Sequence, residues 1–210
     1  MCPLVLDRKE RDKKLREADI LKAAEHIFAT KGYHNSAILD IAEEAQYAVG
    51  TIYLYFRNKQ DLYLTLIERK TEELFTTIKE KVEKVNDPRA KIRVLVEEQL
   101  SYFEENEDFF RIYFSERGGL HWAIKDKISK SAVDKFMKYL DYIAELITEG
   151  QREGVIKSQF DAKKMAYMLA GMMNAMIFPW LRERSMANGR LKHLSEFVLE
   201  VFYEGIGANR

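Results

Sequence analysis

The 210-residue sequence is poor in residues that interrupt or cross-link a chain, with one cysteine, three prolines and ten glycines. Its single thiol, Cys2, excludes a disulfide framework and a cysteine-based zinc site, and it fits a reducing, cytoplasmic compartment. Scarce proline and the lack of alternating β-branched runs leave the chain free to form helices. Because 47% of the residues are hydrophobic, such helices can bury a core, and we expect an all-α fold.

An excess of charge of one sign is also missing, because 34 basic residues balance 34 acidic ones. The zero net charge therefore gives no general argument for a nucleic-acid partner. The segment 45–60 differs locally, since it contains no acid and its cations are Arg57 and Lys59. Its charge is compatible with DNA, although charge alone does not point there.

Motifs for catalysis, metal binding and membrane insertion are lacking. The sequence has no His-Glu-x-x-His, Glu-x-x-His pair, glycine-rich phosphate loop or nucleophile elbow, so we expect no enzyme, metal or cofactor. Residues 165–181 carry no charge, but the run is shorter than the roughly 20 residues that cross a bilayer and contains Asn174 and Pro179. We interpret it as a buried interface helix and expect no membrane partner.

Apolar residues at helical spacing predict three short or medium helices near the N-terminus. The face of the first is formed by Ile20, Leu21, Ala24, Ile27 and Phe28. Lys31-Gly32 is expected to end it, and Ser36 to be the N-cap of the second. The inward side of the third is expected to hold Val49, Ile52, Tyr53 and Phe56.

Asn58 is the predicted cap of a long fourth helix, with Asp61 completing an approximate capping box. Its apolar stripe continues to Val85, ahead of Asn86-Asp87-Pro88. Further helices are predicted at about 88–105, 108–117, 121–150, 162–184 and 190–205, which makes about nine in all. We expect a DNA-binding domain at 1–60 and a larger helical domain at 61–210, with the fourth helix linking them.

The second and third helices have the layout of a helix-turn-helix, whose second helix rests in the major groove. Such a unit needs a small residue where backbones approach, hydroxyls for phosphates, and helix N-termini that face the anionic strand. Gly50 meets the first need, and Thr51, Tyr53 and Tyr55 offer hydroxyls. Lys59 lies in the first turn of a helix, where the dipole disfavours a cation, so we expect a DNA phosphate beside it.

Residues 15–65 resemble the DNA-binding domain of TetR-type (TetR/AcrR) transcriptional regulators. The likeness rests on Ile20-Leu-Lys-Ala-Ala, Lys31-Gly-Tyr, Ile41-Ala-Glu-Glu-Ala and above all on Gly50-Thr-Ile-Tyr-Leu-Tyr-Phe-Arg-Asn-Lys-Gln-Asp-Leu62. The closing segment Phe197-Val-Leu-Glu-Val-Phe-Tyr-Glu-Gly205 also resembles the last helix of the family. The resemblance implies a homodimer that represses transcription from a palindromic operator and is released when a small hydrophobic or aromatic effector binds.

Carried over by position, the resemblance implies a set of DNA-contacting residues. They are Ser36, Ala37, Ala48, Val49, Gly50, Thr51, Tyr53, Leu54, Tyr55 and Lys59. We expect Val49 and Leu54 to make apolar contacts with thymine methyl groups. The sequence departs from the family at Gln46, where a glycine is usual, and at Ala48, where a hydroxyl residue usually caps the helix. Each departure is expected to cost about 1 kcal/mol of stability.

The C-terminal part is expected to supply the dimer interface and the effector pocket. Small and apolar residues of the last two helices predict the interface: Gly171, Asn174, Ala175, Phe197 and Val201. Aromatic and methionine side chains are candidates for the pocket: Phe103, Phe110, Tyr113, Phe114, Trp122, Met168, Met172 and Phe178. The main alternative is a helical protein-binding adaptor without DNA binding, which the zero net charge favours and the hydroxyl-bearing third helix opposes.

Overall fold

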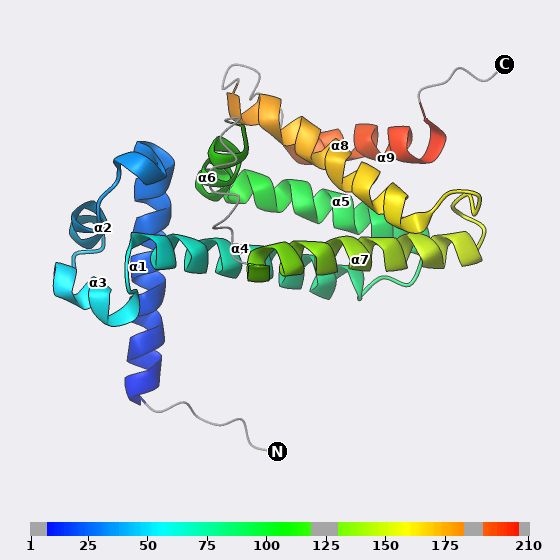
Figure 1. Cartoon of the computed structure of the whole chain (residues 1–210). Coiled ribbons are helices and arrows are strands. Elements are labelled where there is room, and N and C mark those ends of the chain that lie inside the picture. The colour runs from blue at the N-terminus through cyan, green and yellow to red at the C-terminus, as the bar shows by residue number, and fades with distance from the viewer. Residues whose placement is uncertain (1–7, 119–129, 183–190, 206–210) are drawn as a thin grey trace. The chain divides into compact units, whose positions relative to one another are not determined.

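The computed structural model describes residues 8–118, 130–182 and 191–205, which form helices and no strands (Figure 1). They divide into two compact units. The first contains α1 to α3, α4 as far as Arg69, and α6 from Asp108, and the second contains the other described helices. None of the described helices is long and apolar enough to cross a membrane.

The first unit is built around α1 (Arg8–Asn35), α2 (Ile38–Glu44), α3 (Val49–Tyr55) and the start of α4 (Lys59–Val82). The apolar face predicted for the first helix is buried as expected. The core of the unit includes Ile20, Ala24, Phe28, Ile41, Ile52, Phe56, Leu62 and Leu66. Gly32 has a positive φ of 77°, so the chain turns there, as the sequence predicts.

The N-cap of α2 differs from the prediction. Helix α2 begins at Ile38 with Ala37 as its N-cap, and Ser36 lies one residue too early to fill that role. The Ser36 hydroxyl is buried and donates to the carbonyl oxygen of Tyr33 at 2.9 Å. Asp40 instead accepts the N–H of Ala37 at 2.7 Å, so a carboxylate on the third helical residue satisfies the exposed donor.

The turn between α2 and α3 adopts the strained conformation that the sequence predicts. Gln46 has a φ of 57°, a left-handed value that costs a residue with a side chain about 1 kcal/mol. Ala48 is the N-cap of α3 and offers no side-chain hydrogen bond. At the start of α4 the predicted cap is confirmed, because Asn58 Oδ1 accepts the N–H of Asp61 at 2.9 Å.

The second unit contains α5 (Pro88–Glu105), α7 (Lys130–Arg152), α8 (Ala162–Arg182), the short 3-10 helix η2 (Leu191–His193) and α9 (Leu194–Glu204). Helix α6 (Glu107–Gly118) lies between α5 and α7 in the sequence. The predicted bounds of these helices agree closely where the structure describes them. Residues 121–129 of the predicted 121–150 helix, 183–184 of the predicted 162–184 helix and 190 of the predicted 190–205 helix lie outside the described residues.

Apolar side chains of α5, α7 and α8 form the centre of the second unit, where α7 and α8 run in opposite directions (Figure 1). Ile92, Leu95, Ile143, Ile147, Leu169 and Met173 are fully buried there. One polar pair interrupts this core, because the Tyr139 hydroxyl donates to Gln99 Oε1. Lys91 of α5 also binds Glu149 of α7 at 2.6 Å.

Candidate nucleic-acid interface

Helix α3 is anchored by two buried residues and presents the rest of its surface to solvent. Ile52 and Phe56 are buried, whereas Leu54 is 80% exposed and Tyr53 is 53% exposed. Tyr53 therefore does not lie on the inward side, as its spacing predicts, but on the outer surface with Ala48 and Gly50. Val49, Thr51 and Tyr55 are partly exposed beside them. The hydroxyl-bearing residues of α3 are thus available to a ligand.

Gly50 lies in α3 although none of the residues that the structure describes requires a glycine there. A Cβ atom added to Gly50 would meet no atom within 4 Å, and the residue is exposed. Glycine within a helix lowers stability by roughly 0.5–1 kcal/mol relative to alanine. Packing among the described residues therefore does not account for this glycine, whereas close approach of another backbone would.

A hydrogen bond that sequence reasoning missed fastens α3 to α1. The Tyr47 hydroxyl, two residues before α3, donates to Asp19 Oδ2 of α1 at 3.1 Å. Burial and this carboxylate both raise the pKa of Tyr47, so the phenol stays a neutral donor. Because the two residues are 28 positions apart, no local pattern could have paired them.

Lys59 is placed differently from the expectation that it meets phosphate. Its ammonium donates to the carbonyl oxygens of Tyr33 and Ser36, each at 2.6 Å, and lies 4.6 Å from the centre of the Tyr33 ring. The lysine thereby satisfies carbonyl groups where α1 ends and the chain enters α2. Because these carbonyl dipoles surround the ammonium, its positive charge is compatible with a position at a helix N-terminus.

Ser36 and Ala37, both predicted to contact DNA, differ in exposure at the start of α2. Ala37 is exposed and accessible to a ligand, whereas Ser36 is buried. Asp40 also accepts a hydrogen bond from Lys31 at 2.7 Å. The Lys31 ammonium and the Ala37 N–H together lower the pKa of Asp40. The entry to α2 is therefore held by charge-assisted hydrogen bonds.

Helices α8 and α9 of the second unit pack against each other, and both carry exposed apolar or small residues. These are Tyr167, Met168, Gly171 and Ala175 of α8 and Phe197 of α9, and we call them together the α8/α9 face. Asn174 and Val201 on the same two helices are partly exposed. Met168 is 66% exposed and does not point into the core, contrary to its expected place in an effector pocket. A Cβ atom at Gly171 would meet nothing within 4 Å, so this glycine is also not required by packing within the chain.

Of the other predicted pocket residues, two are buried, one is partly exposed, and the side chains of four lie outside the described part of the structure. Phe103 of α5 and Phe110 of α6 are both buried, and Met172 is partly exposed. The side chains of Tyr113, Phe114 and Phe178, and all of Trp122, lie outside the described part of the structure.

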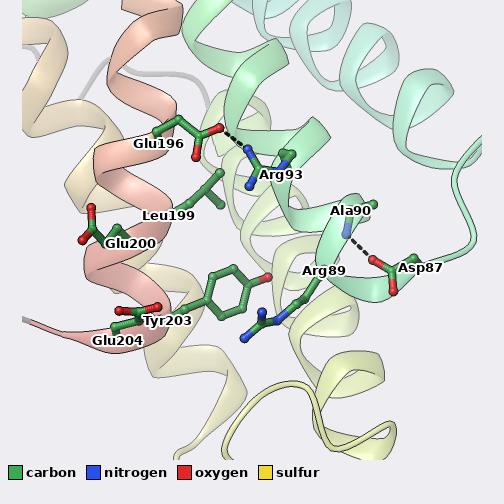
Figure 2. Close-up of a pocket in the computed structure, with 9 residues that line it drawn as sticks. All are labelled: Asp87, Arg89, Ala90, Arg93, Glu196, Leu199, Glu200, Tyr203 and Glu204. Carbon is green, nitrogen blue, oxygen red and sulfur yellow. Dashed lines mark hydrogen bonds and ion pairs between the residues drawn. The ribbon is translucent and has the colours of Figure 1, made fainter.

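A groove of about 440 Å³ between α5 and α9 was not predicted (Figure 2). Arg93 of α5 pairs with Glu196 of α9, and the Arg89 guanidinium lies 4.7 Å from the centre of the Tyr203 ring. Burial raises the pKa of Tyr203 to about 12. Because its lining also includes Asp87, Glu200 and Glu204, this groove suits a polar ligand and not the expected hydrophobic effector.

Known proteins match both units. The family model for bacterial regulatory proteins of the tetR family matches residues 20–66, and the model for the C-terminal region of YsiA-like proteins matches residues 67–205. The fatty acid metabolism regulator protein of Bacillus subtilis (strain 168) is 26% identical over 196 residues, covering 93% of this chain and 98% of the relative.

Two solved structures share the fold over nearly the full length. The transcriptional regulator FadR from Bacillus subtilis in complex with stearoyl-CoA has a TM-score of 0.80 and 26% identity, covering 90% of this chain and 99% of that chain. The fatty acid degradation regulator FadR from Bacillus halodurans has a TM-score of 0.81 and 24% identity, covering 91% and 96%. With its exposed α3 surface and these matches, the chain belongs to the TetR family and is a DNA-binding transcriptional regulator.

Proposed function

We propose that the protein is a homodimeric repressor that places α3 of each subunit in successive major grooves of a palindromic operator. The observation that carries this proposal is the free outer surface of α3, with an exposed glycine, an exposed leucine and three hydroxyl-bearing residues. Gly50 allows close approach of the DNA backbone, while Thr51, Tyr53 and Tyr55 are the proposed phosphate or sugar contacts. Leu54 is the proposed contact to thymine methyl groups.

The proposed dimer forms through the α8/α9 face. Gly171 and Ala175 are one helical turn apart on α8, so both small residues lie on one side of the helix and allow a partner helix to approach. Tyr167 and Met168 of the same helix and Phe197 of α9 add exposed apolar side chains. A two-fold axis through this face would present two copies of α3, which a palindromic site requires.

The proposed effector is a long-chain acyl-CoA thioester that lowers the affinity for DNA. The support is the similarity of almost the whole chain to a fatty acid metabolism regulator and to a FadR solved with stearoyl-CoA. An acyl chain also agrees with the hydrophobic effector expected from the aromatic and methionine content of the C-terminal domain.

A titration with acyl-CoA tests this function. A labelled duplex enriched from a random-sequence pool is bound by the protein, and its fluorescence anisotropy is followed as stearoyl-CoA is added. We expect at least about a tenfold loss of affinity, within the usual range of coupling between two sites. Free CoA, which lacks the acyl chain, is the control and should leave the affinity unchanged.

If both stearoyl-CoA and free CoA release the DNA, or if neither compound releases it, the effector proposal is contradicted. The proposal that the protein binds DNA would stand in either case. The adaptor alternative is not favoured, because the family matches are to regulators with a DNA-binding domain. Failure to enrich any duplex from the pool would contradict the operator proposal itself.

A further inference from the structure

The first three turns of α1 extend beyond the core of the first unit and carry a high density of positive charge. Residues 8–16 hold six cations, Arg8, Lys9, Arg11, Lys13, Lys14 and Arg16, against two acids, Glu10 and Asp12. All of these side chains are exposed. None of the six cations forms an ion pair with any residue that the structure describes, whereas the next acid along the helix, Glu17, pairs with Arg69 of α4.

Three of the six cations continue the buried face of the helix. Lys9, Lys13 and Arg16 are spaced i, i+4 and i+7, which places them on one side of α1. The same spacing leads on to Ile20, Ala23 and Ile27, which are buried. The strip of α1 that packs within the first unit through Ile20, Ala23 and Ile27 therefore carries Lys9, Lys13 and Arg16 in the turns that precede it.

The position of α3 tells which side of α1 this face occupies. Tyr47, two residues before α3, donates a hydrogen bond to Asp19, which lies only one turn after Arg16. Arg16 is close enough to lower the pKa of Tyr47 electrostatically, against the larger effects of burial and Asp19. Figure 1 shows α1 running on past α3 toward its N-terminus within this unit. The row of Lys9, Lys13 and Arg16 thus begins near α3 at Arg16 and continues away from α3 toward Lys9.

We propose that Lys9, Lys13 and Arg16 form a second contact to double-stranded DNA, on the phosphate backbone next to the groove that α3 occupies. The seven-residue interval from Lys9 to Arg16 spans about 10 Å of helix, comparable with the roughly 12 Å width of the major groove. Free cations at this spacing meet phosphates without reading bases, so they add affinity for any sequence. This inference rests on the proposed placement of α3 and extends the DNA-binding surface beyond the helix-turn-helix.

The test compares two triple variants of the full chain that change the charge equally. One variant is Lys9→Gln, Lys13→Gln and Arg16→Gln, and the control is Arg8→Gln, Arg11→Gln and Lys14→Gln on the other sides of the same helix. Glutamine keeps a high helix propensity, and helicity is checked by circular dichroism. The dissociation constant for an enriched duplex is measured at several salt concentrations with each protein.

Each lost phosphate contact lowers the slope of log K against log salt by about 0.9, and a bound homodimer carries two copies of each of the three residues, so we expect the slope of the first variant to fall by about five. The slope of the control should fall by less than one. The affinity for random duplex should fall as much as that for the enriched one. Equal slopes for the two variants, with DNA binding retained by the unaltered protein, would overturn this inference alone. An unaltered protein that binds no duplex at low salt would overturn the proposed function as well.

Discussion

At the residue scale, α3 and the turn before it contain three residues whose type lowers the stability of the free protein. Gln46 adopts a left-handed conformation, Ala48 leaves the helix without a side-chain cap, and Gly50 lies in a helix without steric need. Each costs roughly 1 kcal/mol by comparison with glycine, serine and alanine at these positions. The glycine is the one that a DNA partner explains, because only there does a missing side chain clear the outer surface.

Replacement of Gly50 by alanine should change stability and DNA binding in opposite directions. We expect Gly50→Ala to raise the free energy of unfolding by about 0.5–1 kcal/mol, since the new Cβ enters open space in a helix. The same methyl group should weaken DNA binding at least several-fold because it separates α3 from the duplex. Denaturant unfolding and fluorescence anisotropy measure the two effects. A stabilised variant with unchanged DNA affinity would show that Gly50 does not face the duplex.

At the element scale, helix limits were largely predictable from the sequence because they follow from local patterns. Pro88 at the start of α5, Asn58 before α4 and Gly32 after the long part of α1 all act through neighbouring backbone. The roles of Lys59, Tyr53 and Met168 were not predictable in this way. Each depends on which distant element occupies the adjoining space, which helical spacing does not encode.

Lys59 provides the clearest case of an element held by a distant residue. Because its ammonium binds carbonyls at the end of α1, we expect Lys59→Met to lower the free energy of unfolding by about 2 kcal/mol. The slope of DNA affinity against salt should stay unchanged, since the cation is directed at the protein. Denaturant unfolding and a salt titration measure these quantities, with Arg57→Met as the control for an exposed cation nearby. A slope smaller by about 1.8, which is about 0.9 for each subunit of the bound homodimer, would instead place Lys59 on a phosphate.

At the scale of the whole molecule, the zero net charge concealed how charge is distributed. Unpaired cations gather in the first turns of α1, whereas many acids of the second unit pair with lysine or arginine, as Glu149, Glu98 and Asp141 do. A neutral protein can therefore still present a cationic surface to DNA. Its exposed apolar residues are similarly gathered, with the α8/α9 face holding three of the large ones.

Disruption of the α8/α9 face should separate the subunits without unfolding them. Phe197 is 53% exposed, and we expect Phe197→Glu to weaken the dimer by at least tenfold because it buries an unpaired charge at the interface. Phe160 is 50% exposed outside this face, so Phe160→Glu is a matched control that should remain dimeric. Sedimentation velocity over a range of protein concentrations measures both. Equal behaviour of the two variants would exclude this face as the interface.

The symmetry of the selected DNA tests the account as a whole most directly. The purified protein is used to enrich duplexes from a random-sequence pool through several rounds, and the retained sequences are compared. We predict inverted repeats whose half-sites are separated by about 34–36 Å, or by a multiple of one helical turn, as two copies of α3 related by a two-fold axis require. Enrichment of a single unrepeated site, or no enrichment at low salt, would contradict it.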